Sequence, residues 1–164
     1  MRRLTLVAGL ALSACAAPTD TGAFRTAKAP IYSNASLDLG RLAGAWQQVA
    51  TYGATGPDCP AGRAEFTATA SGLTGQARLC IAGQVRDWSG PVTPAGPGRF
   101  AIGGAEPWWV LWIDADTRTL VIGTPTGAFG FVLDRDGQIP ADRLVAAREI
   151  LAFNGYDPDR LSRY

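Results

Sequence analysis

The chain has 164 residues, of which 47% are hydrophobic, and it contains no histidine. The missing imidazole excludes Ser–His and Cys–His nucleophile pairs and every histidine metal site. Acidic and basic residues nearly balance, with a formal net charge of +1. This balance argues against a nucleic-acid partner, because such binding depends on neutralising phosphates.

The first residues have the pattern of an export signal. An Arg–Arg pair precedes an apolar run over residues 4–12, which is too short for a membrane-spanning helix of about 20 residues. The following Leu12-Ser13-Ala14-Cys15 resembles the bacterial lipobox, in which the thiol is acylated and the cysteine becomes the new N-terminus. The resemblance implies a lipoprotein signal peptide over residues 1–14 and an acyl chain such as palmitate on Cys15. Ala16 then implies sorting to the outer membrane, at its periplasmic face. The alternative is an ordinary signal peptide with a chance cysteine.

The next segment is rich in turn residues. Pro18, Gly22 and Pro30 interrupt residues 15–36, and the segment shows little hydrophobic periodicity. We expect the lipidated cysteine to be followed here by a flexible tether. Residues 37–164 have the length of a single domain.

Short alternating segments dominate this domain, and tight-turn pairs such as Ser71-Gly72 and Ala82-Gly83 separate them. Such runs predict β-strands joined as hairpins. Eight antiparallel strands in sequence order form an up-and-down meander that closes into a barrel wide enough for one small ligand. The predicted strands cover residues 44–52, 63–70, 73–81, 84–93, 99–103, 108–114, 118–123 and 128–135.

After the eighth strand the pattern changes to helical spacing. Leu144, Ala147 and Leu151 recur along one stripe between Pro140, which suits a first helical position, and the stop signal Asn154-Gly155. A helix with one apolar stripe must lie against another element. The predicted strand over 108–114 is apolar on both faces, so we expect the helix to pack outside the barrel on this strand and its neighbours. The sequence thus predicts an all-β barrel with one C-terminal α-helix.

Three short motifs give the chain a family resemblance. Gly44-Ala45-Trp46 opens the first strand, Trp109-Val110-Leu111 is followed by Asp114, and Arg135 ends the last strand. Together they resemble the lipocalin family, most closely its bacterial, lipid-anchored outer-membrane branch. Trp112 and Ala115 depart from the usual second motif. The resemblance covers residues 37–164 and agrees with a helix packed on the barrel wall.

Strand direction places the three motifs at one end of the barrel. Strands alternate in direction, so Gly44, the turn after Asp114 and Arg135 must meet at the end where the first strand begins. In lipocalins the tryptophan plugs this floor and the arginine packs across its ring, a contact worth about 0.5–2 kcal/mol. The resemblance therefore implies structural roles for Gly44, Trp46, Asp114 and Arg135.

The other two cysteines are expected to pair. Cys59 and Cys80 form an even set in an exported chain, and an oxidising compartment makes a disulfide the default. The meander also brings them together: Cys80 lies near the top of its strand, beside the long loop over 53–62 that carries Cys59. A free thiol at either position is the alternative.

Strand alternation also predicts which residues line the barrel. Gln48, Ala50 and Tyr52 share the face of Trp46, and the remaining strands contribute mainly aromatic residues. Arg86 is expected near the mouth, where it could pair with a carboxylate or phosphate head, the alternative being a solvated arginine. For each aromatic residue the alternative is core filling. The predicted ligand-binding residues are Phe66, Arg86, Trp88, Trp108, Val110, Trp112, Phe129 and Phe131.

The resulting functional expectation is a non-catalytic carrier. We expect a fatty acid, lysophospholipid or similar small hydrophobic ligand, held at the cell envelope without a cofactor or metal and with the membrane as partner through the N-terminal lipid. One alternative is an eight-stranded barrel lipoprotein that binds or inhibits a protein such as a metalloprotease, although such inhibitors end with the barrel and lack the helix. Another is an enzyme that uses a cavity thiol, which the expected disulfide disfavours.

Overall fold

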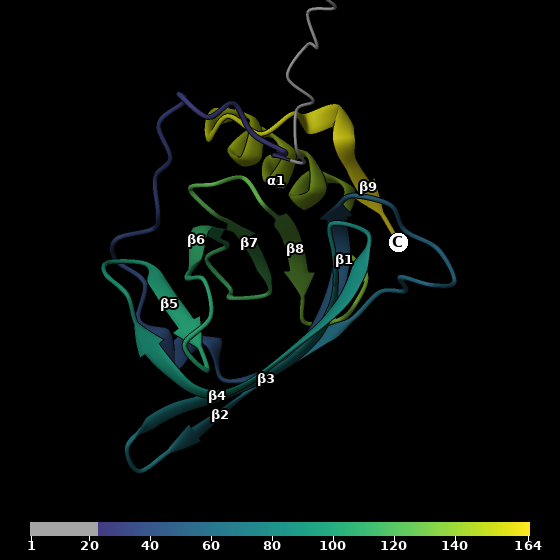
Figure 1. Cartoon of the computed structure of the whole chain (residues 1–164). Coiled ribbons are helices and arrows are strands. Elements are labelled where there is room, and N and C mark those ends of the chain that lie inside the picture. Colours follow the sequence, from purple (N-terminus) through teal and green to yellow (C-terminus); the bar gives the residue numbers. More distant parts are fainter. Residues whose placement is uncertain (1–22) are drawn as a thin grey trace, which may run out of the picture.

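A computed structural model describes residues 23–164 of the chain (Figure 1). The expected signal peptide and Cys15 lie outside the described residues. The structure contains one α-helix, α1 (Ala141–Phe153), and two short 3-10 helices, η1 (Leu39–Leu42) and η2 (Pro158–Arg160). The strands are β1 (Gly44–Tyr52), β2 (Arg63–Thr69), β3 (Gly72–Ile81), β4 (Gln84–Pro94), β5 (Arg99–Ile102), β6 (Trp108–Ile113), β7 (Thr119–Gly123), β8 (Gly130–Asp134) and β9 (Leu161–Arg163).

The first eight strands form a closed antiparallel barrel. Each strand pairs with the next in sequence, and β1 closes the ring by pairing with both β8 and β2. The predicted fold class is therefore confirmed. The short β9 was not predicted. It pairs with the C-terminal half of β1, with Tyr52 opposite Leu161. Figure 1 shows the strands arranged as a ring with α1 outside it.

Two apolar clusters separate the inside of the barrel from its outer wall. The inner cluster fills the ring and includes Trp46, Phe66, Phe100, Trp108, Val110 and Phe131. The outer cluster joins the wall to α1 and includes Val49, Tyr52, Leu111, Val121, Val132, Ala147 and Leu151. The helix contacts β6 and β7, as predicted, because these strands carry apolar residues on both faces. No helix in the described part of the chain is long and apolar enough to cross a membrane.

Two β-bulges correct the predicted facing of three residues. The register of β1 shifts between Gln48 and Ala50, and that of β6 shifts between Val110 and Trp112. An extra residue in a strand reverses the face of every residue beyond it. Ala50 and Tyr52 consequently lie in the outer cluster, and Trp112 packs against that cluster from the outside. The prediction that Trp112 lines the cavity is wrong for this reason.

Residues 23–36, expected as a tether, instead pack along the barrel wall. Phe24 and Arg25 are buried, and the Arg25 guanidinium donates hydrogen bonds to the carbonyl oxygens of Asn154, Pro125, Ala29 and Pro30. A buried guanidinium needs such acceptors because it cannot lose its charge. The segment then continues along the wall to the β4–β5 turn, where the Ser33 hydroxyl donates to the Pro97 carbonyl, and the chain enters η1.

Candidate functional site

The closed end of the barrel is built on Trp46. Its ring is fully buried, its indole N–H donates to the Leu42 carbonyl at 2.7 Å, and the Arg135 guanidinium lies 3.8 Å from the ring centroid. Arg135 also donates to the carbonyl oxygens of Thr117, Ala45 and Arg41. Burial lowers the pKa of Arg135 from its usual value, while the charge of Glu65 opposes that shift. These contacts are structural: they seal the floor.

Gly44 is required at this floor for two reasons. Its φ of +101° lies where side chains are rarely accommodated, and a Cβ there would lie 2.8 Å from an Arg135 nitrogen.

Asp114 organises the neighbouring turn. Its carboxylate accepts the backbone N–H groups of Arg118 and Thr119 and lies 3.6 Å from the Nε of Arg143 in α1.

The open end is tied together differently. Cys59 in the β1–β2 loop forms a disulfide with Cys80 of β3, with the Cα atoms 5.1 Å apart. The predicted disulfide is therefore confirmed. Where the β1–β2 ladder stops at Gln47, the Gln48 side chain replaces it: the amide bonds both backbone groups of Cys80 and accepts the Gly62 N–H. A buried amide with all these partners holds β1 against β3 across the gap.

The interior between the two ends is filled by rings in contact. Phe66 meets Phe100 edge to face, Phe100 meets Trp108, and Trp108 meets Phe131 with centroids 5.0 Å apart. These four side chains are at most 1% exposed. Aromatic pairs in such geometries each add about 0.5–1.5 kcal/mol beyond area burial. The interior of the barrel beneath its open end is therefore a packed core.

A pocket opens above this core. It has a volume of about 170 Å³ and lies among the connections of the open end. Three of the residues predicted to bind ligand, Arg86, Trp88 and Phe129, line it, together with Ile81, Ala82, Ala105, Glu106 and Ala128. Phe66, Trp108, Val110 and Phe131 lie deeper, in the inner cluster, and Trp112 lies outside. Strand alternation therefore predicted correctly that aromatic residues fill the barrel. Only those nearest the open end also line the pocket.

The mouth pocket carries both charges. Arg86 lies on the strand side, and Glu106, which was not predicted, lies on the β5–β6 loop. The Glu106 carboxylate accepts the Thr126 hydroxyl at 2.8 Å, which fixes the loop to its neighbour. The sequence signal that could have identified Glu106 is its place before Pro107, in a connection at the open end of the barrel. The pocket therefore presents one cationic and one anionic side chain.

One polar atom inside the barrel is buried without a partner. The indole N–H of Trp108 is fully buried in the barrel and has no hydrogen-bond partner among the described residues. Leaving a buried donor unpaired costs about 1–3 kcal/mol. The Trp108 ring lies edge to face with Trp88, at 5.6 Å between centroids, and Trp88 in turn lines the mouth pocket.

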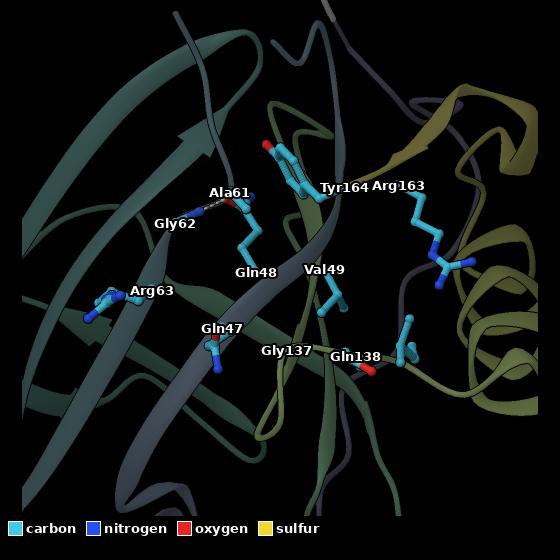
Figure 2. Close-up of a pocket in the computed structure, with 11 residues that line it drawn as sticks. Gln47, Gln48, Val49, Ala61, Gly62, Arg63, Gly137, Gln138, Arg163 and Tyr164 are labelled. Atoms are coloured by element: carbon cyan, nitrogen blue, oxygen red, sulfur yellow. Dashed lines mark hydrogen bonds between the residues drawn. The ribbon is translucent and has the colours of Figure 1, made fainter. Parts of the chain in front are cut away.

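A larger hollow of about 240 Å³ lies outside the barrel, between β1, the start of β2 and the segment 137–139. Figure 2 shows the Gln48 side chain turned toward Gly62 there, while Arg63 and Arg163 lie on opposite sides of it. Its Gln48 is already committed to the hydrogen bonds that hold β1 to β3. The lining of this hollow is more polar than apolar, so compared with it the mouth pocket is the better place for a hydrophobic ligand.

Comparisons with known proteins agree with this architecture. A family model described as the lipocalin-like domain matches residues 37–164. No sequence among curated proteins matches the chain significantly.

Solved structures share the fold at low identity. Insecticyanin from the tobacco hornworm Manduca sexta superposes with a TM-score of 0.59 and 14% identity, over 82% of this chain and 86% of that one. Lobster apocrustacyanin A1 gives 0.53 and 15%, over 76% and 77%. The siderocalin Ex-FABP, whose structure is described as having dual ligand specificities, gives 0.55 and 15%, over 75% and 93%. At these identities the likeness shows the fold alone.

Proposed function

The chain belongs to the lipocalin family, and on that basis we propose that it carries a small hydrophobic molecule in the mouth of its barrel, at the cell envelope. The mouth pocket lined by Trp88, Phe129 and Arg86 is the observation that carries this proposal. Apolar walls supply the affinity, and a few polar groups fix the orientation of the ligand. We propose that the carrier is held at the outer membrane by an acyl chain on Cys15, following the lipobox pattern of the sequence.

The size of the pocket limits what enters without rearrangement. Ligand sites usually measure about 300–1,000 Å³, whereas this pocket has about 170 Å³. We propose that Trp88 is the gate. Its ring is only partly buried, and its displacement would connect the mouth pocket to the indole N–H of Trp108. A ligand with an oxygen acceptor on an apolar body would satisfy that donor. Fatty acids and lysophospholipids have this chemistry, and the Arg86–Glu106 pair suits a head group that carries both charges.

Two alternatives are less well supported. Helix α1 packs on the barrel wall, and the barrel-type metalloprotease inhibitors considered from the sequence lack such a helix. A thiol-based enzyme would need a free cysteine, but Cys59 and Cys80 are joined. We therefore propose a carrier without catalytic activity.

Ligand titration tests this proposal. Tryptophan emission is followed while saturated fatty acids of increasing length, or lysophosphatidylcholine, are added to the delipidated protein. Saturable binding at one ligand per barrel is expected. Each buried methylene contributes about 0.8 kcal/mol, or roughly a fourfold gain in affinity, until the pocket is full. The absence of saturable binding for every ligand, together with the absence of any copurifying lipid in native mass spectrometry, would overturn the carrier.

Matched variants locate the site. Trp88→Ala should extend the range of chain lengths over which affinity rises, because it opens the pocket toward Trp108. Trp112→Phe should leave binding unchanged, since Trp112 lies on the outer wall. Arg86→Ala should lower the affinity for fatty acids more than the affinity for the corresponding alcohols. Glu106→Gln should raise the affinity for fatty acids. Equal effects of the Trp88 and Trp112 changes would place the ligand elsewhere.

A further inference from the structure

The described chain begins at the open end of the barrel. The Phe24 N–H donates to the Gly127 carbonyl at 2.8 Å, and Arg25 donates to Pro125 at 2.7 Å; both acceptors belong to the β7–β8 loop, beside the mouth pocket. The Thr26 N–H donates to Gly155, just beyond the end of α1, at 2.8 Å. The N-terminal segment is thus docked at the rim rather than at the floor.

The contacts of this segment hold it in place at the rim. Arg25 is 6% exposed, and its guanidinium joins the carbonyls of three separate segments. Phe24 is buried against Tyr52, with ring centroids 5.4 Å apart, and the Arg160 guanidinium lies over its ring at 4.8 Å from the centroid. Withdrawing this segment would expose an aromatic ring and leave several carbonyls unpaired. Any chain that precedes Ala23 therefore starts from a fixed point at the rim.

Chain length then limits how the barrel sits on a membrane. Cys15 lies eight residues before Ala23, and eight residues span at most about 28 Å when fully extended. A nine-residue strand such as β1 is itself about 30 Å long before tilt is considered. An acyl chain on Cys15 thus reaches a bilayer near the rim easily, whereas turning the floor to the bilayer would use the whole segment.

The surface at the rim suits a lipid interface. Phe153 at the end of α1 is 68% exposed and contacts Tyr32, which is 54% exposed. The four connections of the open end (53–62, 82–83, 103–107 and 124–129) contain two charged residues, Asp58 and Glu106. The floor, by contrast, exposes Asp38, Arg41, Asp116, Arg118 and Asp136. Exposed aromatic side chains with few charges are typical of protein surfaces that lie at the head-group level of a bilayer.

We propose that the open rim, with the Tyr32–Phe153 pair, rests against the membrane that holds the Cys15 anchor, so that the mouth pocket faces the bilayer and the charged floor faces the aqueous space. This rests on the anchor in the proposed function. Beyond the four connections, segments 26–30 and 157–160 add exposed charges of both signs, Lys28 and Arg160 against Asp157 and Asp159, so apolar contact is the main attraction. A ligand in this arrangement passes between bilayer and pocket without crossing water.

Two labels on one helix test the orientation. Ala152 and Ala141 are both exposed and lie at the rim and floor ends of α1, about 16 Å apart along its axis. Each is changed to cysteine and labelled with an environment-sensitive fluorophore in the acylated full-length protein. The protein is then reconstituted into phosphatidylethanolamine–phosphatidylglycerol vesicles that contain a head-group nitroxide lipid. The label at Ala152→Cys should be quenched several-fold more strongly than the label at Ala141→Cys. Equal quenching, or stronger quenching at 141, would overturn the orientation.

Surface variants separate the interface from the anchor. In the Ala152→Cys background, Phe153→Ser with Tyr32→Ser should reduce the quenching while the protein stays bound to the vesicles. Val145→Ser removes an equally exposed apolar side chain from the middle of α1 and should change nothing. Equal effects of the two sets would remove the aromatic pair from the interface. If mass spectrometry finds no acyl chain on Cys15, the anchor fails and the orientation fails with it. Ligand uptake is measured separately on the same protein, so loss of uptake alone leaves the orientation standing.

Discussion

At the floor of the barrel, Arg135 covers the fully buried Trp46 at 3.8 Å and donates hydrogen bonds to three backbone carbonyls. At the rim, the Cys59–Cys80 disulfide and the Gln48 amide join the β1–β2 loop to β3, and a pocket of about 170 Å³ remains beside them. The floor is stabilised by packing, which requires side chains to fill the interior. The rim is stabilised by a disulfide and directed hydrogen bonds, which leave space for a pocket. An eight-stranded barrel can therefore be closed at one end and still receive a ligand at the other.

The largest expected effect on stability comes from a substitution at the floor. Trp46→Ala should lower the free energy of unfolding by about 3–5 kcal/mol, because it removes a fully buried aromatic side chain. Arg135→Ala should cost less, and the two losses should not add, since the residues touch. Denaturant unfolding of both single variants and the double variant measures the coupling. Strictly additive losses would show that the cation–π contact contributes nothing to the floor.

The sequence predicted the two ends well because strand order and direction follow from hairpin signals. The strand expected over 44–52 is β1 with the same bounds, and Cys80 meets Cys59 where the meander places it. Inward facing was predicted less well. The bulge near Leu111 left no mark in the hydrophobic pattern, because both faces of β6 are apolar, and the bulge near Val49 left none because both faces of β1 mix polar and apolar residues.

Contacts between distant segments were also missed. Arg25 is stabilised by carbonyls of residues up to 129 positions away, and a single sequence gives no sign of such acceptors. Likewise, the sequence showed aromatic residues facing inward but could not show that Phe66, Phe100, Trp108 and Phe131 fill the interior beneath the open end, since filling depends on how the rings pack.

The next effect breaks the rim. Replacing Cys59 and Cys80 together by alanine should cost about 3 kcal/mol, the chain entropy of a loop of this length. The floor should be unaffected, so the coupling between Trp46 and Arg135 should persist in the disulfide-free protein. Thermal unfolding with and without a reductant gives the same comparison for the wild-type chain. A loss of the Trp46–Arg135 coupling would mean that the two ends fold as one unit.

Two glycines with positive φ sharpen the contrast between filled and open space. Gly44→Ala at the floor meets both backbone strain and the Arg135 guanidinium, whereas Gly104→Ala at the rim meets strain with nothing within 4 Å. Strain costs about 1–2 kcal/mol in each case, and a displaced cation–π contact adds about 0.5–2 kcal/mol at Gly44 alone. The difference in unfolding free energy between the two variants measures how tightly the floor is packed.

The smallest effect concerns two tyrosines on the outer side of the rim. The Tyr156 hydroxyl accepts the Thr124 N–H and donates to the Phe129 carbonyl, both at 2.7 Å, whereas the Tyr52 hydroxyl is buried without a partner among the described residues. Tyr156→Phe should therefore destabilise the fold by about 1–2 kcal/mol, and Tyr52→Phe should be neutral or stabilise it by up to about 1 kcal/mol. Equal losses would show that the Tyr52 hydroxyl has a partner after all.

Alkaline pH tests the burial of the Tyr52 hydroxyl. Burial is the largest cause that raises the pKa of both tyrosines above the ordinary value, which is about 10 in an unfolded chain. Below pH 10 both states keep these protons and stability does not depend on them. Above pH 10 the unfolded chain releases them first, so it binds fewer protons than the folded one and stability falls as pH rises. Because Phe cannot ionise, Tyr52→Phe should lose less stability than the wild type between pH 10 and 11.5 in urea titrations. An unchanged slope would mean that the Tyr52 hydroxyl already reaches solvent, and that the rim is looser beneath its N-terminal segment than the packing of Phe24 indicates.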